Sequence, residues 1–565
     1  MKRLVCAVAV LAGAIACSVS LSEHEGRACD PAHSCEPGLE CQGGTCVDPE
    51  SLASQDGGTS SDGGTDGSVD PADDGGTDDA GTEPEPDAGT NDAGVIPGTD
   101  AGTEEYPLNT FFVDPAGDDA NDGRSPETPW KTVGKASTAP LPPGSWVLFK
   151  GGGVWYEMLA PTRSGTEGNP ILFGAYGTGR PVLDGTLPTD QPAPGTAAVN
   201  VNNKSWLIVR GLELRNRRGG TQLVYLQNTN NVRFEDLYMH DAEKGFHASP
   251  SAPSHGITIS QVVVRNISGG SFTHGGFVPK GGTGWVISDS EFSNVEQSCI
   301  IDEGNGTQFL RNRFFDCGKI TTTSDRHGVF LKGPNAVLRD NEVYDTAGAC
   351  LYVTFEGAVL EGNRLHGCGT SGIEWAEQST QPGSLVARRN RIWDARTGIT
   401  LGAATSQRFL LSNNSILTVL ADGTAATAGV VVKTNAEVAL ENNLVTGSAP
   451  TVLSVSRAAP TGAWVDRTNV WHTTGSTPPF SWNAAAMTLA QYQTASAQST
   501  STDVDPKLKS TSPTAPEFTL VSSTPVRDFG VSSPSSGTLT PGCDGAVDHY
   551  CGAAPEPGAL ELLTP

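Results

Sequence analysis

In the middle of the chain, three neighbouring apolar runs are each followed by a charged residue at the same position. Lys280, Glu303 and Lys332 each follow a short run with period-two alternation, which places all three side chains on an outer face. If the runs are stacked strands, about 4.8 Å apart, the residues form a column of alternating charge. Such a column can bind a polyanion. It can also be a plain charge ladder, since exposed ion pairs contribute only about 0 to 1 kcal/mol each.

Residues with acid, base and anion-binding chemistry lie just upstream of these runs. Arg326 has a planar guanidinium that can grip a carboxylate. Lys332 can serve as a general base if neighbouring cations lower its pKa, and His327 or His274 can serve as the acid. We therefore assign these four residues as candidate catalytic residues.

The same alternation divides the strands around Lys332 into an inner and an outer face. It predicts that Val329, Leu331, Leu351 and Val353 point inward. The candidate substrate-binding residues point outward and are Lys280, Phe330, Tyr352 and Glu374. The rings of Phe330 and Tyr352 offer a surface on which a sugar can stack.

The elements that carry these residues belong to a repeat. Seven times, at intervals of 22 to 29 residues, a polar residue is followed two positions later by an apolar one. The polar residues are Ser290, Asn312, Asn341, Asn363, Asn390, Asn414 and Asn442. A solenoid coil cannot bury its apolar face alone, and amides stacked in register can hydrogen-bond along the axis. The pattern predicts an all-β chain, a parallel β-helix.

The strand pattern extends over about 460 residues with almost no helical periodicity. We expect an N-terminal cap and first coils over 106–195, coils over 196–475 and C-terminal coils with a cap over 476–565. One capping helix is expected near 130–137, because exposed terminal coils need protection against edge pairing.

The N-terminus has the features of an export signal. Met1 to Arg3 precede an apolar run of 13 residues that is too short to span a bilayer, so 1–16 is expected to be a signal peptide. Ala14-Ile15-Ala16-Cys17 resembles the lipobox of bacterial lipoproteins, which implies a lipid on Cys17, an anchored segment 17–28 and an outer-membrane or cell-surface location. Plain secretion is the alternative.

The remaining cysteines fall into pairs. Residues 29–46 form a small Cys-rich motif with Gly, Pro and Asp, for which two disulfides are expected and a metal site is the weaker reading; its members are Cys29, Cys35, Cys41 and Cys46. Two later pairs share a separation of 18 and predict bridges within two coils, and a third closes a loop near the C-terminus: Cys299 with Cys317, Cys350 with Cys368, and Cys543 with Cys551.

A segment over 47–105 links this motif to the repeats. It holds 17 acidic residues and no Lys or Arg, which accounts for 17 of the chain's 27 excess negative charges. Such a composition cannot bury a core, so we expect a disordered linker, either an anionic brush above a membrane or a soluble spacer. The charge makes nucleic acid an unsuitable partner. We expect a monomer.

Motifs at both ends of the repeats resemble a known group. They are Phe111 to Gly123 with Pro129-Trp130-Lys131-Thr132, Gly165 to Ile171, Asp528-Phe529-Gly530 and Gly558 to Glu561. These resemble the right-handed parallel β-helix proteins that include polysaccharide lyases, epimerases and glycosidases. The resemblance covers roughly 109–562 and is specific for the fold, since these motifs cap the helix and perform no chemistry.

The resemblance implies an extracellular polysaccharide as partner, and a uronic-acid lyase as the leading activity. In such lyases a cation neutralises a uronate carboxylate while a basic side chain removes the neighbouring proton. They often bind Ca²⁺ through clustered acids, for which Asp302, Glu303 and Asp325 are the candidates.

Two departures from the group leave the chemistry open. Arg326-His327-Gly328 resembles a motif of alginate and chondroitin lyases whose base Lys lies one coil earlier, where this chain has none. Lys244 and Arg265, one coil apart, form a second candidate pair without a convincing Ca²⁺ cage.

Other functions remain on the same scaffold. A glycosidase needs two carboxylates about 5 to 10 Å apart, whereas Glu303 and Glu374 are three coils apart, near 14 Å. A non-catalytic adhesion or glycan-binding module, or a spacer for a partner of the Cys-rich motif, are the further alternatives. No phosphate loop, G-x-S-x-G elbow or H-E-x-x-H motif occurs.

Overall fold

The computed structural model describes residues 40–42, 45–47 and 106–560, apart from 187–196, 216–221, 269–274, 320–325, 377–381, 405–406, 458–461, 476–477 and 544–547. The chain divides into two compact units, 1–98 and 99–565. In the first, β1 (Glu40–Gln42) and β2 (Thr45–Val47) pair antiparallel with Cys41 opposite Cys46. The predicted Cys17, Cys29, Cys35 and linker lie outside the described residues.

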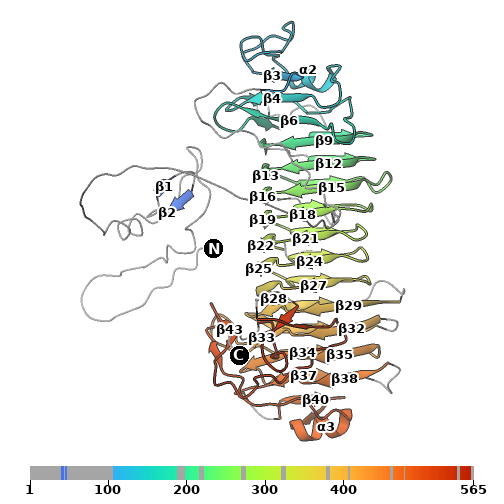
Figure 1. Cartoon of the computed structure of the whole chain (residues 1–565), viewed down its shortest axis with the longest axis vertical. Helices are drawn as coiled ribbons and strands as arrows, with labels where there is room; N and C mark the ends of the chain where they lie inside the picture. The colour runs from blue at the N-terminus through green and yellow to red at the C-terminus, as the bar shows by residue number, and fades with distance from the viewer. Residues whose placement is uncertain are drawn as a thin grey trace, which may run out of the picture. The chain divides into compact units, whose positions relative to one another are not determined.

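The second unit is a right-handed parallel β-helix (Figure 1), as the repeat and the resemblance of the end motifs predicted. A complete coil contributes three strands, and strands of successive coils pair in parallel register. We call the three stacks face 1, face 2 and face 3.

Face 1 is the 14-stranded sheet. Its strands are β3 (Thr110–Val113), β4 (Trp146–Lys150), β6 (Ile171–Tyr176), β9 (Ser205–Arg210), β12 (Asn230–Glu235), β15 (His255–Ser260), β18 (Val286–Ser288), β21 (Gln308–Leu310), β24 (Val337–Arg339), β27 (Val359–Glu361), β29 (Gly383–Arg388), β32 (Gln407–Ser412), β35 (Glu437–Glu441) and β38 (Trp464–Arg467).

Faces 2 and 3 form one 25-stranded sheet, because β28 (Arg364–Trp375) runs through both. Face 2 also contains β5 (Val154–Trp155), β7 (Val182–Asp184), β10 (Glu213–Arg215), β13 (Tyr238–Ala242), β16 (Val263–Ile267), β19 (Glu291–Val295), β22 (Arg313–Cys317), β25 (Glu342–Thr346), β30 (Arg391–Ile392), β33 (Ser415–Thr418), β36 (Leu444–Gly447) and β39 (Val470–Trp471).

Face 3 carries the candidate site. Its other strands are β8 (Ala197–Asn202), β11 (Gln222–Gln227), β14 (Lys244–Ala248), β17 (Phe277–Val278), β20 (Ile300–Asp302), β23 (Val329–Leu331), β26 (Leu351–Val353), β31 (Ala395–Leu401), β34 (Ala428–Val432), β37 (Thr451–Val455) and β40 (Phe480–Trp482), with β41 (Ala485–Met487) antiparallel to the last.

From β9 onward, a one-residue corner joins face 1 to face 2 in eleven successive coils. Eleven successive corner residues have φ between 48° and 70°, the left-handed region that Gly, Asn and Asp adopt most readily. They are Gly211, Asp236, Gln261, Asp289, Arg311, Asp340, Gly362, Arg389, Asn413, Asn442 and Thr468. The tight corner turns the chain without a loop and keeps successive coils in register.

The residue after each corner forms the predicted polar ladder. From Ser290 onward, each backbone N–H donates to the side-chain oxygen of the next coil's Asn at 2.7 to 3.1 Å. The prediction was wrong by one residue in the last coil it covered. Asn442 is the corner residue, with φ of 56°, and Asn443 occupies the ladder, because two consecutive Asn residues there both satisfy the pattern.

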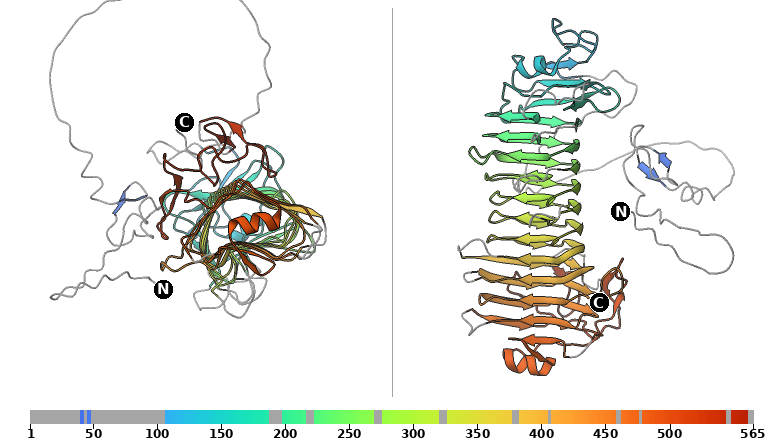
Figure 2. Two further views of the ribbon diagram at one scale, coloured as in Figure 1. Left: turned by 90° about the horizontal axis from the view of Figure 1, so that it is seen from below. Right: turned by 180° about the vertical axis from the view of Figure 1, so that it is seen from behind.

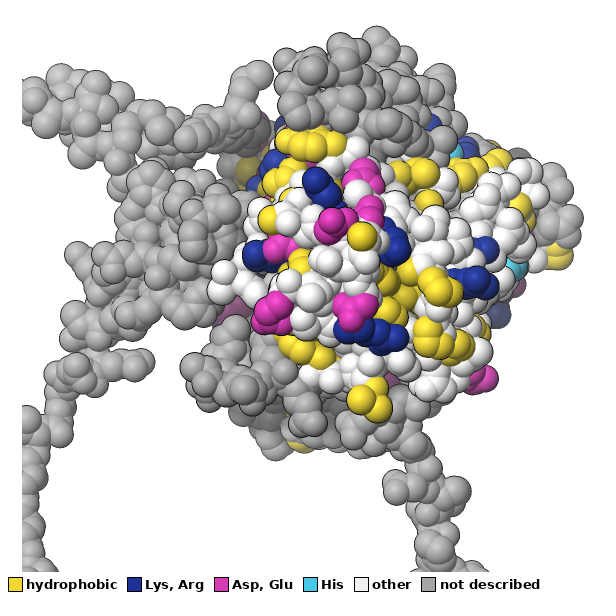
Figure 3. All heavy atoms as spheres, turned by 90° about the horizontal axis from the view of Figure 1, so that it is seen from above, with side chains coloured by type: hydrophobic (Ala, Val, Ile, Leu, Met, Phe, Trp, Pro, Cys, Tyr) yellow, Lys and Arg dark blue, Asp and Glu magenta, His cyan; other side chains and the backbone are white. Residues whose placement is uncertain are grey.

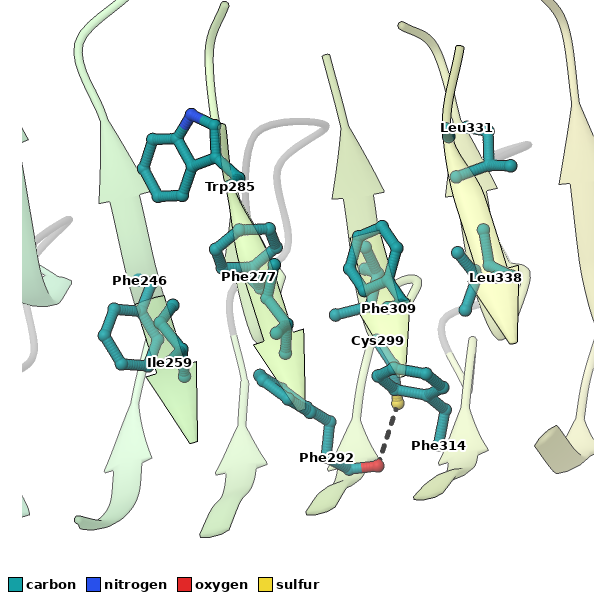
Figure 4. Packing of buried hydrophobic residues seen from close by; sticks show 14 of the residues in the cluster. Phe246, Ile259, Phe277, Trp285, Phe292, Cys299, Phe309, Phe314, Leu331 and Leu338 are labelled. Carbon is teal, nitrogen blue, oxygen red and sulfur yellow. Dashed lines mark hydrogen bonds between the residues drawn. The ribbon is translucent and has the colours of Figure 1, made fainter. Parts of the chain in front are cut away.

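The core runs the whole length of the coils. Rings and aliphatic side chains from all three faces fill it, among them Phe246, Phe277, Trp285, Phe309 and Phe314 (Figure 4). The four residues assigned inward around Lys332 are each fully buried, which confirms the alternation.

A short helix covers each end of the coils. The helix expected over 130–137 is α2 (Val133–Thr138), and Thr132 accepts a hydrogen bond from the N–H of Lys135 as its N-cap. Viewed from that end, charged side chains of both signs lie among apolar ones (Figure 3). At the other end, α3 (Leu489–Ser496) lies across the last coil (Figure 2), where the Tyr492 hydroxyl donates to the buried Asp466. No described helix is both long and apolar enough to cross a membrane.

The C-terminal segment packs against the outer side of face 2. It contains the pairs β42 (Leu508–Ser510) with β43 (Glu517–Leu520) and β44 (Thr540–Pro541) with β45 (His549–Tyr550). Phe518 packs with Trp393 and Leu417 of face 2, which are 6% and 2% exposed. The segment therefore shields apolar side chains of the last coils that would otherwise be exposed to solvent.

Three predicted disulfides are present: Cys299–Cys317, Cys350–Cys368 and Cys543–Cys551. In each of the first two, the first cysteine directly precedes a face 3 strand, and the second lies on face 2 of the next coil. Cys317 ends β22, whereas Cys368 lies within β28. Each bridge covalently links two neighbouring coils, one before and one after Arg326 and His327 in the sequence.

Removing the second bridge is expected to destabilise the coils. The 18-residue separation of Cys350 and Cys368 corresponds to a loss of about 3 kcal/mol in the free energy of unfolding. Denaturant unfolding of the Cys350→Ser/Cys368→Ser variant measures it. Unfolding at the same denaturant concentration as the oxidised wild type would contradict this expectation.

Candidate functional site

The predicted charge column exists on the outer side of face 3. The Nζ of Lys280 lies 2.9 Å from Oε1 of Glu303, and the Nζ of Lys332 lies 3.3 Å from the same oxygen. The three side chains are 14%, 28% and 32% exposed. The column therefore carries one net positive charge, with its carboxylate shared by two ammonium groups.

The aromatic residues of the site are packed against each other. The ring of Tyr352 stacks on His327 with centroids 4.0 Å apart, and Phe330 contacts both rings edge-on. Phe330 is outward in register but only 4% exposed, and the Lys332 ammonium lies 5.4 Å from its centroid. The expectation that Phe330 stacks on a sugar is wrong, since its ring is buried. Tyr352 keeps a partly exposed edge.

His327 is held by backbone hydrogen bonds in the turn before β23. The backbone N–H of His327 donates to Oγ of Ser298 at 3.1 Å, and its ring Nδ1 accepts from the backbone N–H of Ala349 at 3.1 Å. An accepting Nδ1 places the proton of the neutral imidazole on Nε2. Nε2 of His327 is therefore a hydrogen-bond donor, and its predicted role as the acid stays a prediction.

The other predicted residues are divided between the described and undescribed parts of the chain. Arg326 is partly exposed beside His327, and its carbonyl accepts from Gly348 at 2.7 Å. Glu374 continues the column of Phe330 and Tyr352, and accepts from the Thr370 hydroxyl at 3.4 Å. His274 and Asp325 lie outside the described residues.

The acids predicted to bind Ca²⁺ do not share one surface. Asp302 points into the core and is 0% exposed, whereas Glu303 faces outward. The prediction failed for Asp302 because period-two alternation necessarily sends neighbours to opposite faces. Among residues that the structure describes, no cluster of three or more His, Cys, Asp or Glu side chains could hold a metal. A Glu303 carboxylate already paired with two lysines is also a poor cation ligand.

Burial raises the pKa of Asp302 to about 7, although hydrogen bonds from Thr307 and Gly304 lower it. The Thr307 hydroxyl donates to Oδ1 at 2.9 Å and the Gly304 N–H at 3.1 Å. Its Oδ2 has no hydrogen-bond partner. The folded chain thus holds this proton to a higher pH than the unfolded chain does.

Replacing Asp302 with Asn is expected to stabilise the chain at pH 8. Between the ordinary aspartate pKa of 3.8 and about 7 the folded state binds more protons than the unfolded state, so the wild type loses stability as pH rises through this range. The variant should gain about 1 to 3 kcal/mol at pH 8 and nearly nothing at pH 4. Denaturant unfolding at both pH values measures it.

Asp289→Asn is the matched control, because Asp289 is exposed and pairs with Arg311. That pair lowers the pKa of Asp289, so the control should lose rather than gain stability at pH 8. A pH-independent effect of Asp302→Asn would contradict the expectation.

Lys244, weighed from sequence as a second candidate, has the environment of a general base. It is 9% exposed at the start of β14, and no described residue accepts a hydrogen bond from its ammonium. Burial lowers its pKa, Glu243 opposes this, and Lys280 lowers it further. Sequence reasoning could find the residue and its neighbourhood but not its burial, which depends on the folding of adjacent turns.

Arg265, its sequence partner, lies elsewhere. It belongs to face 2, where its guanidinium lies 4.7 Å from the ring centroid of Tyr238. The pair predicted from one-coil spacing is therefore separated onto two faces, and Lys280 of β17's coil is the cation that acts on Lys244.

Comparisons with known proteins agree with this fold. Residues 197–384 match the family described as "Right handed beta helix region". The chain is 27% identical over 231 residues to pectate lyase L of Dickeya chrysanthemi, covering 36% of this chain and 53% of that enzyme. Pectate lyase L of Dickeya dadantii is 26% identical over the same length and share. The chain thus spans about half the length of these relatives.

Solved structures resemble it more loosely. Pectate lyase Pel9A has 18% identity and a TM-score of 0.42, covering 80% of this chain and 96% of that one. The surface adhesin PfbA of Streptococcus pneumoniae has 13% identity and a TM-score of 0.38, covering 59% and 87%.

Proposed function

We propose that this protein acts on an extracellular anionic polysaccharide and cleaves it at a uronic-acid residue by β-elimination on face 3. The observation that carries the proposal is Lys244, a buried amine without a described hydrogen-bond acceptor, whose pKa is lowered by burial and by Lys280 although Glu243 raises it. The partial similarity to pectate lyase L supports the same substrate class.

In the proposed reaction, Lys244 accepts the proton on the carbon next to the uronate carboxylate. The electron pair of that C–H bond forms a C=C bond, and the bond to the departing glycosidic oxygen breaks. That oxygen takes a proton from solvent water. Lys280, on the coil after Lys244, supplies positive charge that stabilises the developing negative charge on the carboxylate. Lys332 and Arg326 lie three coils from Lys244 and can bind carboxylates of other residues of the polymer.

Lys332 fits the role of a cation better than that of the base. Its ammonium lies 3.3 Å from Oε1 of Glu303, which holds it in an ion pair. Lys244 makes no hydrogen bond with a described residue, and burial and Lys280 lower its pKa, although Glu243 opposes them.

The described residues give no support to a Ca²⁺-dependent mechanism. The candidate acids are split between the core and an ion-paired column, so no step is assigned to a metal. Activity measured with Ca²⁺ and with a chelator tests this directly.

We extend the proposal to the location of the protein. Cleavage after residue 16 and acylation of Cys17 would place the β-helix at the cell surface, beyond the acidic segment 47–105. Detergent partitioning of the wild type, and its loss in Cys17→Ser, are the expected results. Equal partitioning of the two would favour plain secretion.

Product masses test the proposed reaction. The full chain is incubated with polygalacturonate, alginate, chondroitin and heparin, and the fragments are analysed by mass spectrometry. Elimination gives fragments one water lighter than the products of hydrolysis. Fragments of hydrolysis mass would replace the proposal with a glycosidase.

A non-catalytic glycan-binding module is the second candidate. It is favoured by the closed Lys280–Glu303–Lys332 ion pairs and by the buried Phe330, which suit a rigid binding face as well as a catalytic one. Retention of a polysaccharide without fragments would be its signature.

A further inference from the structure

A cavity of about 340 Å³ lies at the corner between faces 3 and 1 in the first coils. Two consecutive coils form it, since Leu159 pairs in parallel with Val199 of β8. The first coil contributes Ala160, Pro161 and Thr162, and the second contributes Asn200, Asn202, Asn203 and Lys204. A volume of this size lies in the range of pockets that bind small ligands.

The cavity combines one cation with polar groups. The Lys204 ammonium donates to the backbone carbonyl of Asn203 at 3.2 Å, and it forms no ion pair with any acid in the described part of the chain. Of the described residues that line the cavity, none is Asp or Glu. An ammonium has three N–H donors, so two of those on Lys204 remain for a ligand. This lining favours an anionic ligand.

Two further side chains can bind hydroxyl groups of the same ligand. Oδ1 of Asn202 accepts from Nδ2 of Asn203 at 2.7 Å, which leaves the Nδ2 of Asn202 as a donor. The Thr162 hydroxyl donates to the carbonyl of Ser137 at 3.0 Å, which leaves its oxygen as an acceptor. Asn202 and Thr162 are both exposed. A sugar that carries a carboxylate beside hydroxyl groups fits this set of donors and acceptors.

Two aromatic rings lie between the cavity and Lys244. On face 3, Tyr225 is in register with Asn200 on one side and with His247 on the other. The two ring centroids are 5.8 Å apart, and both side chains are partly exposed. Nδ1 of His247 lies 3.4 Å from Oε1 of Gln222, the in-register neighbour of Lys244. The rings therefore continue from the neighbourhood of Lys244 toward the cavity.

The separation of the cavity from Lys244 exceeds the length of one sugar unit. Lys244 is in register with Ala197 two coils earlier, and Asn202 follows Ala197 at the far end of β8. The coil spacing then gives about 10 Å along the axis, and the rise per residue gives about 16 Å along the strand. Only a chain of several sugars can occupy both places at once.

We propose that this cavity binds a uronate unit of the anionic polysaccharide, several sugars away from the bond that is cleaved at Lys244. The inference rests on the proposed function and extends it to the recognition of long chains. Lys204 binds the carboxylate, and Asn202 and Thr162 bind hydroxyl groups of the same unit. Tyr225 and His247 contact the units in between. Binding energy from a remote unit favours long substrates over short ones.

Binding of galacturonate oligomers of two lengths tests the cavity. The full chain carries Lys244→Met so that the oligomers stay intact, and isothermal titration compares a trimer with a decamer at two salt concentrations. Adding Asn202→Ala and Lys204→Gln is expected to weaken decamer binding about tenfold or more, because a hydrogen bond to a charged group is lost. Trimer binding should stay within about twofold. The salt dependence of decamer binding should fall with the lost ion pair.

Lys433→Gln is the matched control. Lys433 is exposed and lies at the same corner just after β34, many coils from the cavity. This variant is expected to bind both oligomers within about twofold of the parent. Lys204→Gln alone is measured as well, so that a folding defect caused by Asn202→Ala does not decide the result. Unchanged decamer binding in Lys204→Gln, or an equal loss in Lys433→Gln, would overturn the inference.

The two oligomers and the salt series separate the other outcomes. Equal weakening of trimer and decamer would place the effect at Lys244 itself, and unchanged salt dependence would mean that the cavity binds a neutral sugar. Either result, or a parent that binds no decamer, overturns the inference. Failure of the proposed lyase reaction gives a different pattern. In that case the wild type forms no unsaturated product, yet decamer binding still depends on Lys204.

Discussion

Replacing Lys244 with Met is expected to lower kcat for polysaccharide cleavage by about 10² to 10⁴, the usual contribution of a general base. Methionine keeps the volume and apolar stem of the side chain but cannot accept a proton. Since the Lys244 ammonium has no described hydrogen-bond partner, its loss should leave the fold intact and KM little changed. Initial rates on polygalacturonate, with a thermal unfolding scan of each variant, measure the effect.

The wild-type pH profile gives an independent check on the same residue. Burial and Lys280 lower the pKa of Lys244, so the rate should rise with pH around a midpoint below the ordinary lysine value of 10.5. Lys433→Met is the matched control, because Lys433 is an exposed lysine just after face 3 strand β34. Unchanged kcat in Lys244→Met, or equal losses in both variants, would place the base elsewhere.

Replacing Asn363 with Ala is expected to lower the free energy of unfolding by about 3 to 5 kcal/mol. Its Oδ1 accepts from both the N–H and the side-chain amide of Asn341, at 3.0 and 3.1 Å. Its Nδ2 donates to the carbonyl of Leu338 at 3.0 Å and to Asn390 at 2.9 Å. Each buried group left without a partner costs about 1 to 3 kcal/mol.

Asn305→Ala controls for the loss of an amide as such. Asn305 accepts one exposed side-chain hydrogen bond, from Asn335 at 3.0 Å, and its replacement should cost less than about 1 kcal/mol. Denaturant unfolding compares the two variants. Equal destabilisation would mean that the ladder contributes no more than a surface hydrogen bond.

The fold could be predicted because its signals are local and repeated. Period-two alternation identified the inner residues around Lys332, and a polar residue every 22 to 29 positions identified the ladder. The pairing of Cys299 with Cys317 followed from a separation that recurs in the next pair. The one-residue error at Asn442 arose where a corner and a ladder position carry the same residue type.

The candidate site was less predictable, because the burial of an outward-pointing side chain depends on contacts with segments distant in the sequence. The alternation correctly predicted that Phe330 points outward. It did not predict that the ring is buried against His327 and Tyr352. The same limit hid the environment of Lys244.

The absorbance of the unsaturated uronate during incubation of the full wild-type chain with polygalacturonate tests the central claim most directly. The account predicts a steady rise that persists in the presence of a chelator. No rise across polygalacturonate, alginate, chondroitin and heparin, with polysaccharide still retained by the protein, would contradict it and identify a binding module.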